Sequence, residues 1–212
     1  MSGIVATGGE KKEFERPEAG TYGARCIHIV DLGTHDKEWQ GKVSKRHQVL
    51  LVFEIDSEME GKYDEQYKGK RFVVNWKGTL SIGENAHLRR HLESWRGKKF
   101  TKEEAKGFDL KNILDKPCVL SLVESEWKDK TYINIETISP PMKGMKIPDA
   151  ENDLVFFPIT DIETGDWEKL WPWEQKIIME SDEGKAFTAG GEPFTSPEES
   201  GESEDGDEPV PF

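Results

Sequence analysis

A single stretch of helical periodicity, set between runs of alternating residues, most limits the folds open to this chain. Residues 84–96 carry Leu88, Leu92 and Trp95 at helical spacing, and Gly97 follows as a stop signal. Strand-like runs lie on both sides of this segment, three before it and two after it, at residues 22–31, 47–55, 70–77, 118–124 and 131–138. The predicted order of elements is therefore β-β-β-α-β-β.

The place of the helix in this order separates the candidate folds. A ferredoxin-like fold needs a helix after its first strand, and a doubly wound fold needs helices throughout. Three strands, one helix and two strands follow the connectivity of the five-stranded Greek-key OB barrel. Its ligands lie across strands two and three, between the loops that join strands one to two and four to five. We therefore expect a mainly β protein, with an OB barrel over residues 18–141.

The segments outside this barrel differ in composition. Residues 1–17 are polar, and we expect a flexible lead-in without a secretory apolar region. Residues 142–181 hold an apolar run at 154–159 and a tryptophan-rich segment at 167–179, in which Pro172 suits the first turn of a short helix. This extension should pack on the barrel exterior, or otherwise on a partner surface.

The formal net charge of −13 hides a division of charge along the chain. Residues 1–148 hold 26 Lys and Arg against 23 Asp and Glu, whereas residues 149–212 hold 3 against 19. A mildly basic body therefore precedes a strongly acidic final third. Over residues 182–212 Gly, Glu, Ser and Pro dominate, and we expect a disordered acidic tail. No apolar run reaches the length of a membrane helix, so a soluble protein in a reducing cytoplasm is expected.

Cations and aromatic rings gather where an OB barrel would bind its ligand. Proteins that bind a single nucleic-acid strand without sequence preference use cations along the phosphates and flat rings for base stacking, worth about 1–3 kcal/mol per base. Residues 32–46, expected as a long loop or hairpin tip, and the short connection 125–130 each hold a tryptophan among lysines. The candidate stacking residues are Trp39, Trp76 and Trp127, followed by Phe72 and Tyr132. The candidate phosphate ligands are Lys42, Lys45, Arg46, Arg71, Lys77, Lys128 and Lys130.

Each of these candidates also has a structural interpretation. Phe72 and Trp76 share one strand face and are core residues if that face points inward. Trp39 and Trp127 lie in polar segments, where burial is harder, and a binding role is favoured.

The remaining motifs favour structure over chemistry. His87 and His91 are four apart on the expected helix, a spacing that can hold a metal, but no nearby cysteine or carboxylate completes a ligand set. We therefore expect surface histidines, and neither a metal nor a cofactor. Cys26 and Cys118 fall on the first and fourth strands, which are neighbours in an OB barrel, and should be buried free thiols. The sequence has no phosphate-binding glycine loop, nucleophile elbow or paired-carboxylate motif, so no enzymatic activity is expected.

The acidic tail stops on an aromatic residue behind two prolines. An exposed ring gains nothing in water, whereas a peptide captured by a partner uses prolines to limit its backbone entropy, a ring to fill a pocket and a carboxylate to meet a basic residue. We expect a partner-binding tip formed by Asp207, Glu208, Pro209, Val210, Pro211 and Phe212. The alternative is a solubility tail that ends on Phe212 by chance.

Short motifs in the body resemble those of bacteriophage single-stranded DNA-binding proteins: Gly20-Thr21-Tyr22, Asp31-Leu32-Gly33, Trp39-Gln40-Gly41-Lys42 and Trp171-Pro172-Trp173 before an acidic tail. The resemblance spans residues 17–181. The tail is also similar to the tip of bacterial single-strand-binding proteins, which ends in Ile-Pro-Phe, with Val210 in place of Ile and an extra Pro209.

The resemblance implies a protein that coats single-stranded DNA in phage DNA replication, recombination and repair, in the cytoplasm of the bacterial host. Its tip would recruit a polymerase, helicase, primase or nuclease, and we expect a monomer or dimer. One alternative is an acidic interaction or DNA-mimic protein, which would occupy the DNA site of another protein. The lower alternative is a nuclease or recombination enzyme, for which the sequence lacks clustered catalytic carboxylates.

Overall fold

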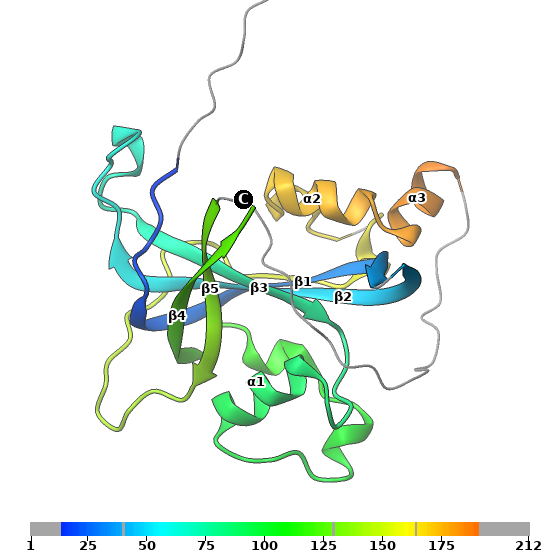
Figure 1. Cartoon of the computed structure of the whole chain (residues 1–212), viewed down its shortest axis with the longest axis horizontal. Helices are drawn as coiled ribbons and strands as arrows, with labels where there is room; N and C mark the ends of the chain where they lie inside the picture. Colours follow the sequence, from blue (N-terminus) through cyan, green and yellow to red (C-terminus); the bar gives the residue numbers. More distant parts are fainter. Residues whose placement is uncertain (1–13, 40, 129, 164, 191–212) are drawn as a thin grey trace, which may run out of the picture.

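The computed structural model describes residues 14–39, 41–128, 130–163 and 165–190 (Figure 1). It contains one mainly antiparallel sheet, whose strands are β1 (Gly20–Trp39), β2 (Lys42–Glu58), β3 (Arg71–Thr79), β4 (Pro117–Trp127), β5 (Lys130–Ser139) and β6 (Val155–Phe157). The strands β3-β2-β1-β4-β5 are antiparallel neighbours in this order, and β6 pairs in parallel with β1. The sheet is open: β3 and β5 lie close together, but no ladder of hydrogen bonds joins them within the described residues.

The helices lie on both sides of this sheet. Figure 1 shows α1 (His87–Arg96) below the sheet, and α2 (Pro172–Met179) and α3 (Asp182–Thr188) above it. Short 3₁₀ turns occur at Glu65–Tyr67, Glu104–Lys106, Leu110–Ile113, Ile159–Asp161 and Trp167–Lys169. As predicted, one α-helix lies between the third and fourth strands of the sheet. Gly97 ends α1 as predicted, with φ 65° and its N–H directed at the carbonyls of Glu93 and Ser94.

The main hydrophobic core lies between the sheet and α1. The helix buries Leu88, Leu92 and Trp95, the residues that its sequence periodicity selects, and the Trp95 ring packs 5.7 Å from that of Phe53. Cys26 and Cys118 belong to the same core as free thiols, on strands that pair with each other, as predicted. Burial raises the pKa of both thiols, so they stay protonated.

A second hydrophobic cluster covers the opposite face of the sheet. Val30, Leu50 and Val52 point away from α1 and meet side chains of the C-terminal extension, including Phe157 and Ile178. Pro172 stands in the first turn of α2, as its sequence position predicts. The extension therefore packs on the sheet rather than awaiting a partner surface. No helix among the described residues is both long and apolar enough to span a membrane.

Buried polar contacts fasten the start of this extension. Glu54, on β2, accepts hydrogen bonds from the backbone N–H groups of Glu151 and Asn152, from the Asn152 amide, and from Arg71. Its side chain is 1% exposed. Arg71 also donates to the carbonyl of Asp149 at 2.8 Å. Neither the periodicity nor the charge pattern of the sequence predicts these contacts.

Residues 32–46 form a β-hairpin and its tip, one of the two forms expected for this segment, because β1 and β2 stay paired as far as Trp39 and Lys42. Two other expectations are wrong. Residues 125–130 are mostly strand rather than a short connection, because β4 and β5 stay paired as far as Trp127 and Lys130. Residues 182–188 form α3 rather than the start of a disordered tail, because Ser181 caps the helix by accepting from the Gly184 N–H. The predicted partner-binding tip, residues 207–212, lies outside the described residues.

Candidate nucleic-acid interface

The β1–β2 hairpin projects beyond the rest of the sheet. Pairing of β2 with β3 ends at Gln48 opposite Thr79, whereas pairing of β1 with β2 continues to Trp39 opposite Lys42. We call residues 33–39 and 42–48 the ribbon. Because directly opposed residues in an antiparallel pair share a face, the register of the ribbon assigns each side chain to one of two faces.

One face of the ribbon, here called the cationic face, carries positive side chains. His35 is opposite Arg46, Lys37 is opposite Ser44, and Lys42 follows by alternation along β2. The same face continues onto β3, where Lys77 is opposite Leu50. Neither the ribbon nor β3 places an acidic side chain on this face. The cations of the cationic face are therefore Lys37, Lys42, Arg46 and Lys77, and His35 lies among them.

The other face of the ribbon, here called the mixed face, carries both signs of charge. Asp36 is opposite Lys45, and Glu38 is opposite Val43. Asp182 at the start of α3 forms an ion pair with Lys45. Lys45 is therefore separated from the other predicted phosphate ligands of the ribbon, Lys42 and Arg46, and already has an anionic partner.

Electrostatic shifts show that the cations of this face lie close together. Burial lowers the pKa of Lys77, and the neighbouring charge of Lys37 lowers it further, while Glu180 opposes both. Burial also lowers the pKa of His35, helped by the charges of Lys77 and Lys185, although the hydrogen bond to the Leu32 carbonyl and the charge of Glu183 oppose this shift. His35 is therefore neutral at pH 7, whereas repulsion among the lysines favours an anion that neutralises them.

Arg46 has unused hydrogen-bonding capacity. Its Nε is buried and has no hydrogen-bond partner among the described residues. A guanidinium donates in a planar fork that matches the oxygens of a phosphate.

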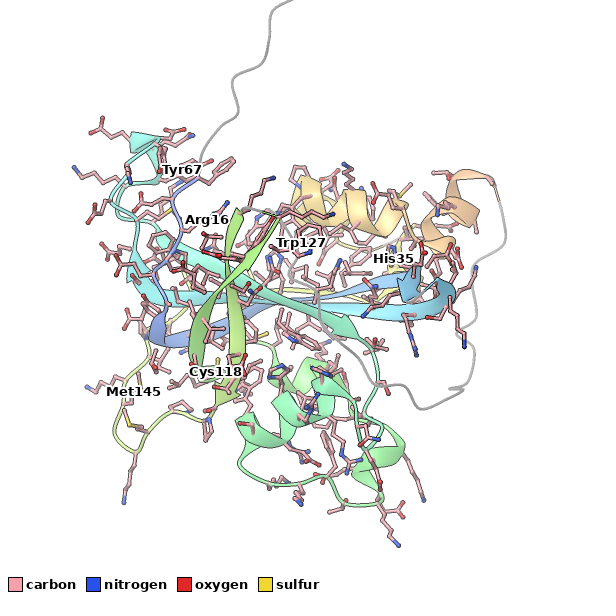
Figure 2. The ribbon with its side chains drawn as sticks, in the orientation of Figure 1. Arg16, His35, Tyr67, Cys118, Trp127 and Met145 are labelled. Carbon is pink, nitrogen blue, oxygen red and sulfur yellow. The ribbon has the colours of Figure 1, made fainter. Side chains whose placement is uncertain are left out.

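The β4–β5 hairpin supplies an aromatic ring on the same side of the sheet. Trp127 is 37% exposed, and Nζ of Lys128 lies 3.9 Å from its ring centroid. Figure 2 shows Trp127 and His35 both on the side of the sheet that carries α2. A stacked base is worth about 1–3 kcal/mol, more than the ~0.5–1 kcal/mol of an exposed cation–π contact. A base can therefore replace Lys128 over the ring and leave that cation for a phosphate. Lys130, opposite Trp127, is exposed beside it.

Three predicted stacking residues are buried and cannot stack on bases. Phe72 and Trp76 are 7% and 6% exposed, because the alternation of β3 directs them into the core beside α1. Gly78 makes room for the indole, since a Cβ there would lie 2.3 Å from the Trp76 ring. Tyr132 on β5 is 6% exposed.

Arg71 is also not a phosphate ligand. Its guanidinium binds the buried Glu54 carboxylate at 2.8 Å, and its Nε is 3.2 Å from Glu151. These contacts fix the extension to the sheet. For Trp39 the structure describes only the backbone, which is in register with Lys42.

Lys37 and His35 lie on the candidate interface but were not among the predicted site residues. Both lie within residues 32–46, where the sequence indicated a long loop or hairpin tip. The spacing of His35 and Lys37 would indicate a shared face in a strand, but the sequence pattern of this segment does not by itself identify a strand.

The structure offers no alternative centre for metal chemistry in the part of the chain that it describes. No group of three His, Cys, Asp or Glu residues there could hold a metal ion. His91 is half-buried against the Trp76 ring, 5.1 Å away, so it is not the surface histidine that was expected. Burial, with smaller effects of His87 and Arg90, lowers the pKa of His91 to about 4.

No protein-family model matches the chain, and no curated protein matches it either.

Proposed function

We propose that this protein binds single-stranded DNA without sequence preference, along a path over the cationic face and Trp127. The observation that carries the proposal is the sorting of charge by the ribbon register. Lys37, Lys42, Arg46 and Lys77 share one face, while Asp36 and Glu38 are on the other. A polyanion gains by contact with the first face only, since each phosphate neutralised by a cation releases a counterion.

The topology supports an OB barrel as the framework for this path. An OB barrel has a helix between its third and fourth strands, as this chain does. The strand order β3-β2-β1-β4-β5 would also be that of an OB barrel if β3 paired with β5. Ligands of OB barrels lie between the first-to-second and fourth-to-fifth connections. Those connections are here the ribbon and the hairpin that carries Trp127. Because the extension covers Leu50 and Val52, DNA would pass beside the extension on its way between the ribbon and Trp127, rather than across the middle of the face.

The proposed biological role rests on the sequence. Such a protein would coat and protect single strands during phage DNA replication, recombination and repair, as a monomer or dimer in the cytoplasm of the bacterial host. It would recruit a polymerase, helicase, primase or nuclease through residues 207–212. Enzymatic activity and cofactors are not part of the proposal.

Titration with oligo-dT at several salt concentrations tests the proposal. Tryptophan fluorescence should be quenched, with duplex DNA ineffective, and affinity should fall with salt at a slope of about −0.7 for each phosphate neutralised. The double variant Lys37→Gln/Arg46→Gln should make this slope shallower by about 1.4. The matched control, Lys99→Gln/Lys102→Gln in the segment that follows α1, should leave the slope unchanged.

The same experiment separates the alternatives. Absence of quenching at low salt would contradict the proposal and favour an acidic DNA mimic. Equal slopes for the two double variants would exclude the cationic face as the binding surface. Cleavage of labelled single strands in the presence of magnesium or manganese would instead identify a nuclease.

A further inference from the structure

The ribbon carries most of the cationic face, but beyond Gln48 no third strand pairs with it among the described residues. Beyond Gln48 it is a two-stranded hairpin, and such hairpins are marginally stable in water. Its tip is exposed, with Val43 at 66%. A cation held on a mobile arm must lose conformational entropy when it binds a phosphate, so whatever fixes the ribbon should strengthen binding.

The α3 helix contacts the ribbon at its base through a buried carboxylate. Glu183 is 4% exposed, and its two oxygens accept hydrogen bonds from the Thr34 N–H at 2.6 Å and the Thr34 hydroxyl at 2.8 Å. Pairing of β6 with β1 covers only His28 to Val30. Glu183 therefore satisfies a backbone donor on β1 beyond the point where β6 ends.

The fit between α3 and the ribbon is close. Gly33 adopts φ +78°, a conformation that favours glycine, and a Cβ at this position would lie 2.7 Å from Ser181 Oγ and 2.7 Å from Glu183 Oε2. Ser181 is itself fully buried and begins α3. The Ser181 and Glu183 side chains therefore pack directly against the β1 backbone at Gly33.

A histidine on the second strand of the ribbon joins the same network. His47 Nε2 lies 2.6 Å from Asp31 Oδ1, and His47 Nδ1 lies 3.3 Å from the Thr34 hydroxyl and 3.7 Å from Glu183. Asp31 also accepts the Gly33 N–H at 3.0 Å. Polar contacts therefore connect β1, β2 and α3 at the one place where the ribbon leaves the sheet.

We propose that Glu183 is a positioning residue for DNA binding: through Glu183, α3 braces the ribbon and fixes the direction in which the cationic face points. Glu183 lies at the ribbon base and is buried, so it acts through Thr34 and His47 rather than by touching DNA. Its consequence for affinity rests on the proposed function, whereas the brace itself does not.

Hydrogen exchange of the free protein tests the brace without DNA. Glu183→Gln removes the charge that Thr34 and His47 share, and amides of residues 34–47 should exchange about tenfold faster, as expected for loss of a hydrogen bond to a charged group. Amides of β4 and β5 should be unchanged. The matched control is Glu168→Gln, an exposed glutamate of the extension, which should alter neither. Unchanged exchange in the ribbon of Glu183→Gln would overturn the proposal.

DNA binding gives a second readout that general destabilisation would not produce. Glu183→Gln should weaken oligo-dT binding about threefold to tenfold while the salt slope stays constant, because no phosphate contact is removed. A shallower salt slope would overturn the positioning role. Tighter DNA binding by Glu183→Gln would also overturn it, because α3 would then be a competitor for the cations.

A milder variant covers the case in which Glu183→Gln unfolds the whole protein. Thr34→Val removes the hydroxyl contacts with Glu183 and His47 but keeps the N–H contact, and valine suits a strand, so ribbon exchange should accelerate by a smaller factor. No acceleration would overturn the brace. If the wild-type protein does not bind oligo-dT, the proposed function fails while the exchange result still decides whether Glu183 braces the ribbon.

Discussion

Replacement of Glu54 by glutamine should separate the C-terminal extension from the sheet at a calculable energetic cost. The carboxylate accepts from Arg71 at 2.8 Å, from the N–H groups of Glu151 and Asn152 at 3.0 Å and 2.9 Å, and from the Asn152 amide at 2.7 Å. A glutamine of equal size turns one acceptor into a donor that faces other donors. Removing one partner of a buried ion pair costs ~3–5 kcal/mol.

The cost for Glu54→Gln should be at the lower end of this range. Arg71 is 15% exposed and keeps its contacts with Glu151 and the Asp149 carbonyl, so we expect about 3 kcal/mol. For a chain of this size 1 kcal/mol shifts Tm by about 2–4 °C, which gives a fall of about 6–12 °C. Calorimetry at pH 7 measures it, with Glu58→Gln, an exposed glutamate on the same strand, as the control.

The effect of Glu54→Gln should also depend on pH with a defined sign. Burial alone would raise the pKa of Glu54, but the hydrogen bonds from Glu151, Asn152 and Arg71 outweigh it and lower the pKa below 4.5. The stabilisation is therefore present above pH 4.5 and is lost as pH falls through the lower folded value. A fall in Tm under about 2 °C at pH 7, or one that persists undiminished in strong acid, would refute this reasoning.

Other predictions concern the core, the interface and the ribbon base. Trp76→Ala should cost about 3–5 kcal/mol of stability in chemical denaturation; Trp127→Ala should change stability by less than about 0.5 kcal/mol yet weaken oligo-dT binding by about 1–3 kcal/mol. Burial would lower the pKa of His47, but the hydrogen bond to Asp31 and the charges of Asp31 and Glu183 raise it above 6.5. The midpoint of its NMR titration should therefore lie above 6.5, and Asp31→Asn should lower this midpoint. The linked stabilisation of the fold is present below pH 6.5 and is lost as pH rises through the folded pKa. Gly33→Ala should cost about 1–3 kcal/mol, from its positive φ and the contact with Ser181, and should expose the ribbon to proteolysis.

The order of elements could be predicted because each buried face leaves a periodic mark. Leu88, Leu92 and Trp95 face the core at helical spacing, and Phe72, Val74 and Trp76 face it at strand spacing. The ribbon leaves no such mark. Its faces carry polar and charged residues, so no apolar alternation distinguishes it from a loop. Instead, a hydrogen bond between residues 149 apart in sequence, Thr34 and Glu183, links it to α3.

The candidate interface could be predicted in part for the same reason. Composition located the cations of residues 32–46 and the tryptophan at 127, but only the strand register separates Arg46 and Lys42 from Lys45. Whether Phe72 and Trp76 meet a ligand or the core depends on which face α1 covers, a property of tertiary structure. Arg71 resembled a phosphate ligand because its partner, Glu54, lies on a different strand and is 17 residues away.

The apolar run of β2 explains why the extension belongs to the folded unit. In a barrel strand with one solvated face, apolar and polar residues should alternate. Here Val49, Leu51 and Phe53 enter the core beside α1, while Leu50 and Val52 enter the cluster formed with the extension. A run buried on both faces requires a covering layer, which residues 155–178 provide. Since that layer occupies the middle of the outer face, the DNA path that we propose would pass beside it, where the ribbon projects.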